Sequence, residues 1–409
     1  MRKFLLAFST VFLGSSVLGD GLFDDHEWGG SLRMRYESVD DSLNEVARAF
    51  TTRATGYLKI SSKQGLGVFA ELEAVQGIGN YNDGGQNDNL THATIADPDG
   101  LELNRFYVSF SPLAGNSDTV LKVGRFNCNH ADINVDRYLS NIGWRQNHRT
   151  YDGISFDSKF GKRRIRSAVV VNVNRVFGED NPNPIRANFE VRAVGIQYDH
   201  SFSPALNAEG YIYNFIFDDI PRFSTQTIGV KFFGETPMSD NMKWIYKLDL
   251  ARQQGIDENP NQDDKYSYSA VTLGVGLPQF ADARLTVNSE IFNSNGVESF
   301  ITPLGSGHAY FGWADRFLSY PTIGINDTWL ALDLKVGEYG VKLRWHTLRS
   351  DVNSIDYGTE FDWSISGKIS ESMSWTIKGA LYSGDDNPAN LPHLSRDTDK
   401  LWAWLSVKL

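Results

Sequence analysis

Apolar side chains alternate with polar or small ones along most of this 409-residue chain. In the C-terminal run KLWAWLSVKL, Leu401, Ala403, Leu405, Val407 and Leu409 share one face of an extended strand. A period of two over eight or more residues indicates a β-strand whose two faces meet different environments. Eighteen segments show this pattern, at residues 28–37, 49–63, 66–76, 102–112, 118–126, 149–159, 164–175, 187–201, 206–217, 223–233, 241–252, 265–277, 283–293, 325–336, 339–350, 356–367, 373–382 and 398–409.

The connections between these segments alternate between long and short. Long ones include 77–101, 127–148 and 294–324, whereas 64–65 and 337–338 are tight turns. Outer-membrane barrels combine short periplasmic turns with longer extracellular loops. A propeller would show a repeat of roughly 40–50 residues, which the sequence lacks. The sequence therefore predicts an all-β fold: a transmembrane antiparallel β-barrel with 18 strands, periplasmic termini and long extracellular loops.

The first 19 residues have the pattern of a signal peptide. A cationic start, MRK, precedes the apolar run FLLAFSTVFLG and small residues at a cleavage position after Gly19. We expect residues 1–19 to be cleaved and residues 20–409 to form a single barrel domain in the outer membrane of a Gram-negative bacterium. Its expected partners there are the barrel-assembly machinery, membrane lipid and lipopolysaccharide. A net charge of −11 argues against nucleic acid as a partner.

The strand faces divide the charged residues between lipid and lumen. If the apolar face meets lipid, the lumen carries more basic than acidic side chains, including Arg33, Arg105, Arg164 and Arg344. A lumen lined by Arg and Lys favours anions. The acidic residues concentrate in loops such as NYNDGGQNDN, where Asp83 and Asp88 are weak candidates for a calcium site. No other metal and no cofactor is expected.

Two pairs in the loops raise the alternative of a surface enzyme of the lipase or protease type. His148 with Asp152, or His308 with Asp315, supplies a base and its orienting acid. Each pair is more simply explained as a loop-packing contact, so the chain is expected not to be an enzyme. A structural or adhesive barrel without conduction is a further alternative.

Two blocks of sequence resemble the alginate-export family of outer-membrane porins. The first, VGRFNCNHADINVDRYLSNIGWRQNHRTYDGISF, spans 123–156, and the second, FITPLGSGHAYFGWADRFLSYPTIGINDTWL, spans 300–330. The resemblance implies an 18-stranded monomeric barrel that conducts an anionic polysaccharide through an Arg-lined constriction. The residues that it points to are Arg125, Arg137, Arg145, Arg149, Asp152 and Asp315.

Together these observations predict a passive channel for anionic carbohydrate, either sugar acids or an alginate-like acidic oligosaccharide or polysaccharide. The loops 127–148 and 294–324 are expected to fold inward and narrow the pore, with carboxylates holding the Arg side chains in place. A less selective general porin is the alternative within the same class. The orientation of Arg125 stays open, because the segment 118–126 has apolar residues on both faces.

Overall fold

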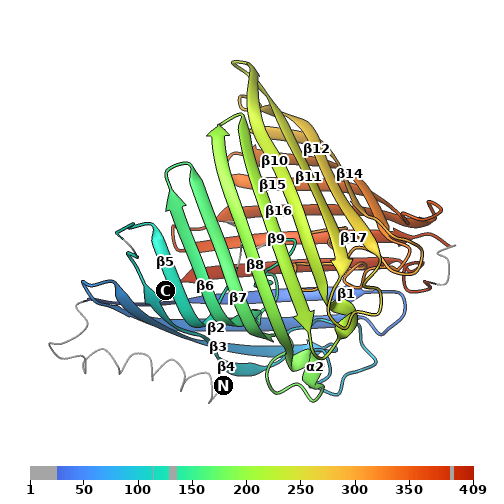
Figure 1. Cartoon of the computed structure of the whole chain (residues 1–409). Coiled ribbons are helices and arrows are strands. Elements are labelled where there is room, and N and C mark those ends of the chain that lie inside the picture. The colour runs from blue at the N-terminus through green and yellow to red at the C-terminus, as the bar shows by residue number, and fades with distance from the viewer. Residues whose placement is uncertain (1–24, 114, 129–135, 387–390) are drawn as a thin grey trace.

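The computed structural model of the chain describes residues 25–113, 115–128, 136–386 and 391–409. The expected signal peptide, residues 1–19, lies outside these ranges. Within them, eighteen strands form one sheet in which every neighbouring pair is antiparallel. Strand β1 pairs with both β2 and β18, so the sheet closes on itself (Figure 1). The predicted 18-stranded antiparallel barrel is confirmed.

Each strand corresponds to one of the eighteen segments predicted from the period of two. Their bounds are β1 Asp25–Asp40, β2 Ala47–Ser61, β3 Leu66–Asn80, β4 Gly100–Phe110, β5 Thr119–Phe126, β6 Thr150–Phe160, β7 Arg163–Asn174, β8 Asn188–Ser203, β9 Leu206–Phe217, β10 Thr225–Ser239, β11 Met242–Gly255, β12 Lys265–Leu277, β13 Ala283–Phe292, β14 Ile325–Val336, β15 Tyr339–Arg349, β16 Asp356–Lys368, β17 Met373–Gly384 and β18 Thr398–Lys408. The helical elements described are a single turn, α2 (Pro184–Ala187), and a 3-10 turn, η2 (Pro221–Phe223). No helix in the described ranges is long and apolar enough to cross a membrane.

The two faces of the wall differ as the alternation requires. Outward positions hold apolar side chains that nothing in the chain covers, such as Leu273, Val287 and Leu330, which are 59%, 56% and 49% exposed. Inward positions on the same strands hold buried carboxylates such as Glu290 and Asp327. An exterior band of exposed apolar residues is stable only in contact with lipid, so this barrel spans a membrane.

The longer connections gather at one end of the barrel, around α2, and the tight turns lie at the other (Figure 1). The described chain also begins and ends at the tight-turn end. There the Leu409 amide donates to the Gly30 carbonyl over 2.9 Å, and the Lys408 amide donates to the Ser372 carbonyl over 2.8 Å. We call the two ends the long-loop end and the short-turn end.

Gly124 and Gly153 form a register pair where β5 ends at the long-loop end. Both have positive φ, 129° and 157°. A Cβ on Gly153 would lie 2.0 Å from the Val169 carbonyl oxygen, and one on Gly124 would lie 2.4 Å from that of Phe106. The backbones of the neighbouring strands therefore approach these two positions so closely that only glycine fits there. β5 ends two residues later, at Phe126, and the chain leaves the wall.

Candidate functional site: the lumen and its inner loops

Two segments fold from the long-loop end into the barrel, and we call them the inner loops: residues 136–149 and 293–324. Tyr138 packs against Tyr211 on β9, with ring centroids 4.9 Å apart. Only six residues further, Trp144 packs edge-on against Trp402 on β18 at 5.3 Å. Strands β9 and β18 lie on opposite sides of a closed 18-stranded sheet, so the first inner loop crosses the lumen.

The second inner loop packs on the first. The Ser140 amide donates to the Leu304 carbonyl over 3.0 Å, and the Ser306 amide donates to the Asp136 carbonyl over 2.9 Å. Buried aromatic side chains from both loops and from the wall form the core between them, including Phe292, Phe300 and Phe311. Together the inner loops occupy part of the lumen near the long-loop end.

Arginines on the wall hold the first inner loop in place. Arg33 on β1 donates Nη1 to the Gly143 carbonyl at 2.9 Å and Nε to Gln146 Oε1 at 2.8 Å. Arg35 donates to the Trp144 carbonyl at 2.7 Å. Because these donors are satisfied by the chain itself, Arg33 lines the lumen as a support of the loop.

A buried ionic cluster joins the inner loops to the wall, and we call it the Asp315 cluster. Asp315 Oδ2 accepts from Lys400 on β18 at 2.9 Å and lies 3.5 Å from Arg145 Nη2. Arg145 also pairs with Glu37 on β1 at 3.2 Å. His308 Nδ1 lies 2.7 Å from Asp315 Oδ1, and the side chains of all five residues are at most 9% exposed.

The charges of this cluster determine its protonation. Burial would raise the pKa of Asp315, but His308, Lys400 and Arg145 hold it well below the usual range. Burial lowers the pKa of His308 to about 3, so the ring is neutral at physiological pH. Its Nε2 lies 2.7 Å from Nζ of Lys378. A neutral ring satisfies both contacts when Nδ1 carries the proton and donates to Asp315.

Arg137 is enclosed by aromatic rings. Its guanidinium carbon lies 3.4 Å from the ring centroid of Tyr310, 4.8 Å from that of Phe311 and 4.9 Å from that of Phe292. The side chain forms an ion pair with Glu290, which outweighs burial and raises the pKa of Arg137. Arg137 therefore stabilises the inner loops, and burial of its guanidinium keeps it from contact with a solute in the lumen.

Arg125 and Asp152 lie on the outer face, contrary to their predicted place in a constriction. They are register partners, with Arg125 Nε donating to Asp152 Oδ1 over 2.8 Å. Two residues along each strand, Val123 and Ile154 are exposed on the lipid side. The neighbouring Tyr151 is fully buried on the inner side. Alternation along a strand then puts Arg125 and Asp152 outside the lumen.

The remaining predicted wall residues are inward and form ion pairs. Arg105 Nε donates to Glu71 at 2.9 Å, and Arg164 lies 2.7 Å from Asp157. Arg344 lies 2.6 Å from Asp333. Several inward carboxylates were not identified from the sequence. They are Glu37, Asp199, Glu209 and Asp327.

Three arginines at the long-loop end make no ion pair within the described ranges: Arg149, Arg175 and Arg186. Arg149 is buried, and its Nη1 donates to the Gly305 carbonyl at 3.4 Å. Burial, and then the positive charges of Arg149 and Arg186, lower the pKa of Arg175 to about 9. We call these residues the arginine group. Arg175 and Arg186 were missed because they lie in an irregular loop with no strand pattern, NRVFGEDNPNPIR.

The tight-turn half of the lumen is open. Inward-facing Lys243, Arg284, Lys335 and Lys342, all near the short turns, are exposed. Lys335 and Lys342 form no ion pair in the described part of the chain. The lumen therefore has a solvent-exposed, lysine-lined half below the inner loops and an arginine group above it.

The candidate calcium and enzyme sites are not assembled. Asp83 Oδ1 accepts from the amides of Gln86 and Asn87 at 2.8 and 3.2 Å, which ties it to its own loop. No group of three metal-binding side chains occurs among the described residues. His148 contacts Glu73 at 3.3 Å, on the opposite side of the wall from Asp152.

His308 does meet Asp315, but its second nitrogen faces Lys378, where a hydrolase would need its nucleophile. The geometry of this pair is therefore that of a buried packing contact.

Comparison with protein-family models gives no match, and no curated protein matches the sequence. Solved structures do match over nearly the whole chain. OccAB4 of Acinetobacter baumannii has a TM-score of 0.70 and 11% identity, covering 96% of this chain and 100% of that one. OccK3 (OpdO) of Pseudomonas aeruginosa has a TM-score of 0.67 and 13% identity, covering 95% and 96%. The outer membrane protein OpdK of Pseudomonas aeruginosa gives 0.68 and 11%, covering 95% and 100%.

These neighbours overturn the resemblance to the alginate-export family. They are Occ and Opd porins, which form a different porin family, so the assignment made from the two sequence blocks is wrong. In the structure, those blocks supply the inner loops and their contacts with the wall. At 10–13% identity the likeness extends to the fold. The chain has the 18-stranded barrel fold of outer-membrane porins.

Proposed function

We propose that this protein is a passive outer-membrane channel that passes small anionic solutes. The observation that carries the proposal is the arginine group at the long-loop end. Arg149, Arg175 and Arg186 lie together there, and each donates to a backbone carbonyl but has no ion-pair partner in the described ranges. Mutual repulsion among three cations makes an incoming anion the favourable neighbour. An arginine side chain also offers a planar pair of donors that fits a carboxylate.

The ion pairs of the other arginines favour passage of an anion through the lumen, because they prevent it from being bound too tightly. Arg105, Arg164 and Arg344 have their charge balanced by a neighbouring acid. A lumen with every cation free would bind an anion too tightly to release it. Single unpaired cations in the exposed half of the lumen, such as Lys335 and Lys342, would bind an anion more weakly as it passes along the pore.

An aromatic row supports sugar acids as the solute class. Tyr57, Phe69 and Tyr107 stack on three successive strands, with centroid distances of 5.5 and 5.0 Å. Arg105 lies 4.6 Å from the Phe69 ring, and Lys122 lies 5.0 Å from that of Tyr107. Along this part of the wall, a sugar acid could stack the apolar face of its ring on an aromatic side chain and pair its carboxylate with a neighbouring cation.

Planar-bilayer recording tests the proposal. In a KCl gradient the wild-type reversal potential should show anion preference, and Arg175→Gln should reduce it. Arg252→Gln is the matched control, because Arg252 is an exposed cation on the outer face of β11. Cation preference of the wild type, or absence of conductance, would contradict the proposal. Liposome swelling with gluconate and glucose then separates a sugar-acid channel from a general porin, which would pass both alike.

A further inference from the structure

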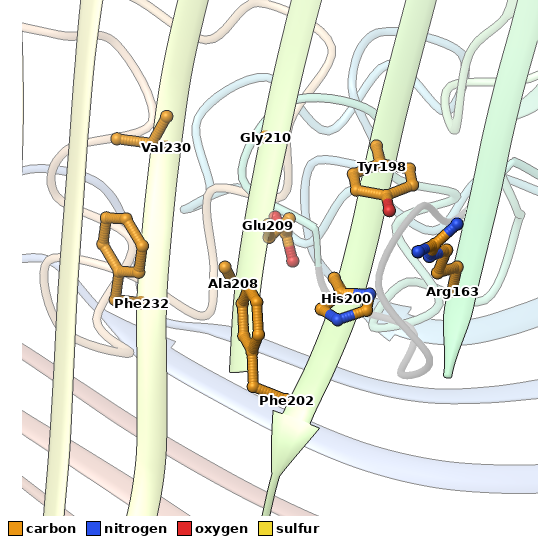
Figure 2. A pocket seen from close by; sticks show the side chains of 9 residues that line it. All are labelled: Arg163, Tyr198, His200, Phe202, Ala208, Glu209, Gly210, Val230 and Phe232. Carbon is orange, nitrogen blue, oxygen red and sulfur yellow. The ribbon is translucent and has the colours of Figure 1, made fainter. Parts of the chain in front are cut away.

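A groove runs along β9 on the lipid-facing side of the barrel, close to the short turns. Figure 2 shows the side chains that line it, which come from four adjacent strands: Arg163 on β7, Tyr198, His200 and Phe202 on β8, Ala208, Glu209 and Gly210 on β9, and Val230 and Phe232 on β10. Glu209 belongs to the floor through its backbone, since its carboxylate pairs with Lys231 inside the lumen at 2.8 Å. The groove is open to the lipid side and has a volume of about 360 Å³.

Two small residues create the groove. Gly210 lies between its register partners Tyr198 and Val230, and Ala208 lies between His200 and Phe232. The large side chains of β8 and β10 therefore form two ridges, and β9 forms a low floor between them. A Cβ added at Gly210 would have no heavy atom within 4 Å, so the space above this floor is empty of protein. Its shape suits a single extended alkyl chain.

One end of the groove carries positive charge. Arg163 is exposed, and it makes no hydrogen bond or ion pair within the described ranges. Its register partner is His200, whose Nδ1 is buried without a hydrogen-bond partner there. Lys162, in the adjoining turn, adds a second cation. An unpaired arginine beside a lipid-facing apolar groove calls for an anionic group placed at the membrane surface.

We propose that this groove binds one anionic glycerophospholipid from the periplasmic leaflet. Short turns of such barrels face the periplasm, which places Arg163 at the headgroup level of that leaflet. The phosphate would pair with Arg163, while one acyl chain would lie over Ala208 and Gly210 between the two ridges. Burial of the chain favours any lipid, whereas Arg163 selects for negative charge. The inference rests on the membrane-spanning fold and not on the proposed conduction.

Native mass spectrometry of the full chain in detergent, titrated with phosphatidylglycerol or phosphatidylcholine, tests the site. Wild-type protein should retain one phosphatidylglycerol at concentrations where phosphatidylcholine is lost. Arg163→Gln should weaken retention of phosphatidylglycerol by about tenfold, because one charge-assisted contact is removed. Gly210→Leu should abolish retention of both lipids by filling the groove.

Matched controls change the same surface elsewhere. Arg252→Gln removes an exposed cation from the outer face of β11 at the long-loop end, and Val287→Leu enlarges an outward side chain away from the groove. Both should bind like wild type. Equal retention of the two lipids by wild type, or unchanged retention in Arg163→Gln and Gly210→Leu, would overturn the proposal. Bilayer conductance measured on the same variants should be unaltered, which keeps this test separate from that of the channel.

Discussion

Trp144 and His308 stack face to face, with ring centroids 3.8 Å apart and planes inclined by only 8°. One residue comes from each inner loop, so this stack joins two segments that leave the wall at different places. Lys378 approaches both, lying 4.4 Å from the Trp144 ring centroid and 2.7 Å from His308 Nε2. The stack and the Asp315 cluster beside it therefore fix the inner loops to each other and to the wall.

Replacing Trp144 by Ala should release the inner loops. The change removes the stack on His308 and the edge contacts with Trp402 and Trp404. Loss of a packed tryptophan costs about 3–5 kcal/mol, enough to populate an undocked loop. We expect larger and noisier single-channel currents in planar bilayers. Trp244→Ala, on the lipid-facing side, is the control and should leave the current unchanged; steady wild-type currents in Trp144→Ala would contradict this role.

The docking of the inner loops should weaken in acid. The pKa of His308 is about 3 in the docked state, against an ordinary value of 6.5. Protonation therefore favours the released loop: the contribution of His308 is fully present above pH 6.5 and falls as the pH drops toward 3. The loss is about 1.4 kcal/mol per pH unit across this window. Gating events in bilayer recordings should become more frequent between pH 6.5 and 4.

His308→Gln provides the comparison for this pH dependence, since a glutamine side chain does not titrate in that range. The variant should show gating that is nearly independent of pH over the same interval. An acid-dependent rise of equal steepness in the variant and in wild type would assign the effect to other groups.

Arg125→Gln should leave ion selectivity unaltered. Arg125 shares the outer face with Val123 and is paired with Asp152, so removal of its charge does not reach the pore. The reversal potential in a KCl gradient should match that of wild type, in contrast to the shift expected for Arg175→Gln. A shift as large as that of Arg175→Gln would place Arg125 in the lumen.

The barrel could be predicted from the sequence because lipid imposes one simple rule on every strand. Most outward positions along the middle of the strands are apolar, as at Leu273 and Leu330, and the strand number follows from counting those runs. The rule for the inner face is weaker. Under the inner loops the lumen is filled by aromatic side chains, so Phe126 and Tyr151 point inward although they are apolar. Strand β5 thus has apolar residues on both faces, which hid the orientation of Arg125.

The partners of the charged loop residues could not be predicted for a different reason. Arg145 pairs with Glu37 across 108 positions of sequence, and Arg137 pairs with Glu290. Such pairings depend on the position that a loop takes inside the closed barrel. The alternation of residues along a strand does not predict that position. The sequence therefore pointed to Arg137 and Arg145 as constriction residues, but it did not reveal that each forms an ion pair with an acidic residue of the wall.

Removal of Arg137 alone should destabilise the barrel more than removal of the whole ion pair. Arg137→Met leaves Glu290 buried at 2% exposure among aromatic rings, with Tyr268 as its remaining donor at 2.8 Å. Breaking a buried pair in this way costs about 3–5 kcal/mol, whereas replacing both charges can be nearly neutral. We therefore expect a large drop in the melting temperature of Arg137→Met, measured by circular dichroism in detergent, and recovery of most of it in the double variant Arg137→Met/Glu290→Gln. Equal melting temperatures for the single and double variants would show that Arg137 acts mainly through its contacts with Tyr310 and Phe311, and that its pairing with Glu290 contributes little.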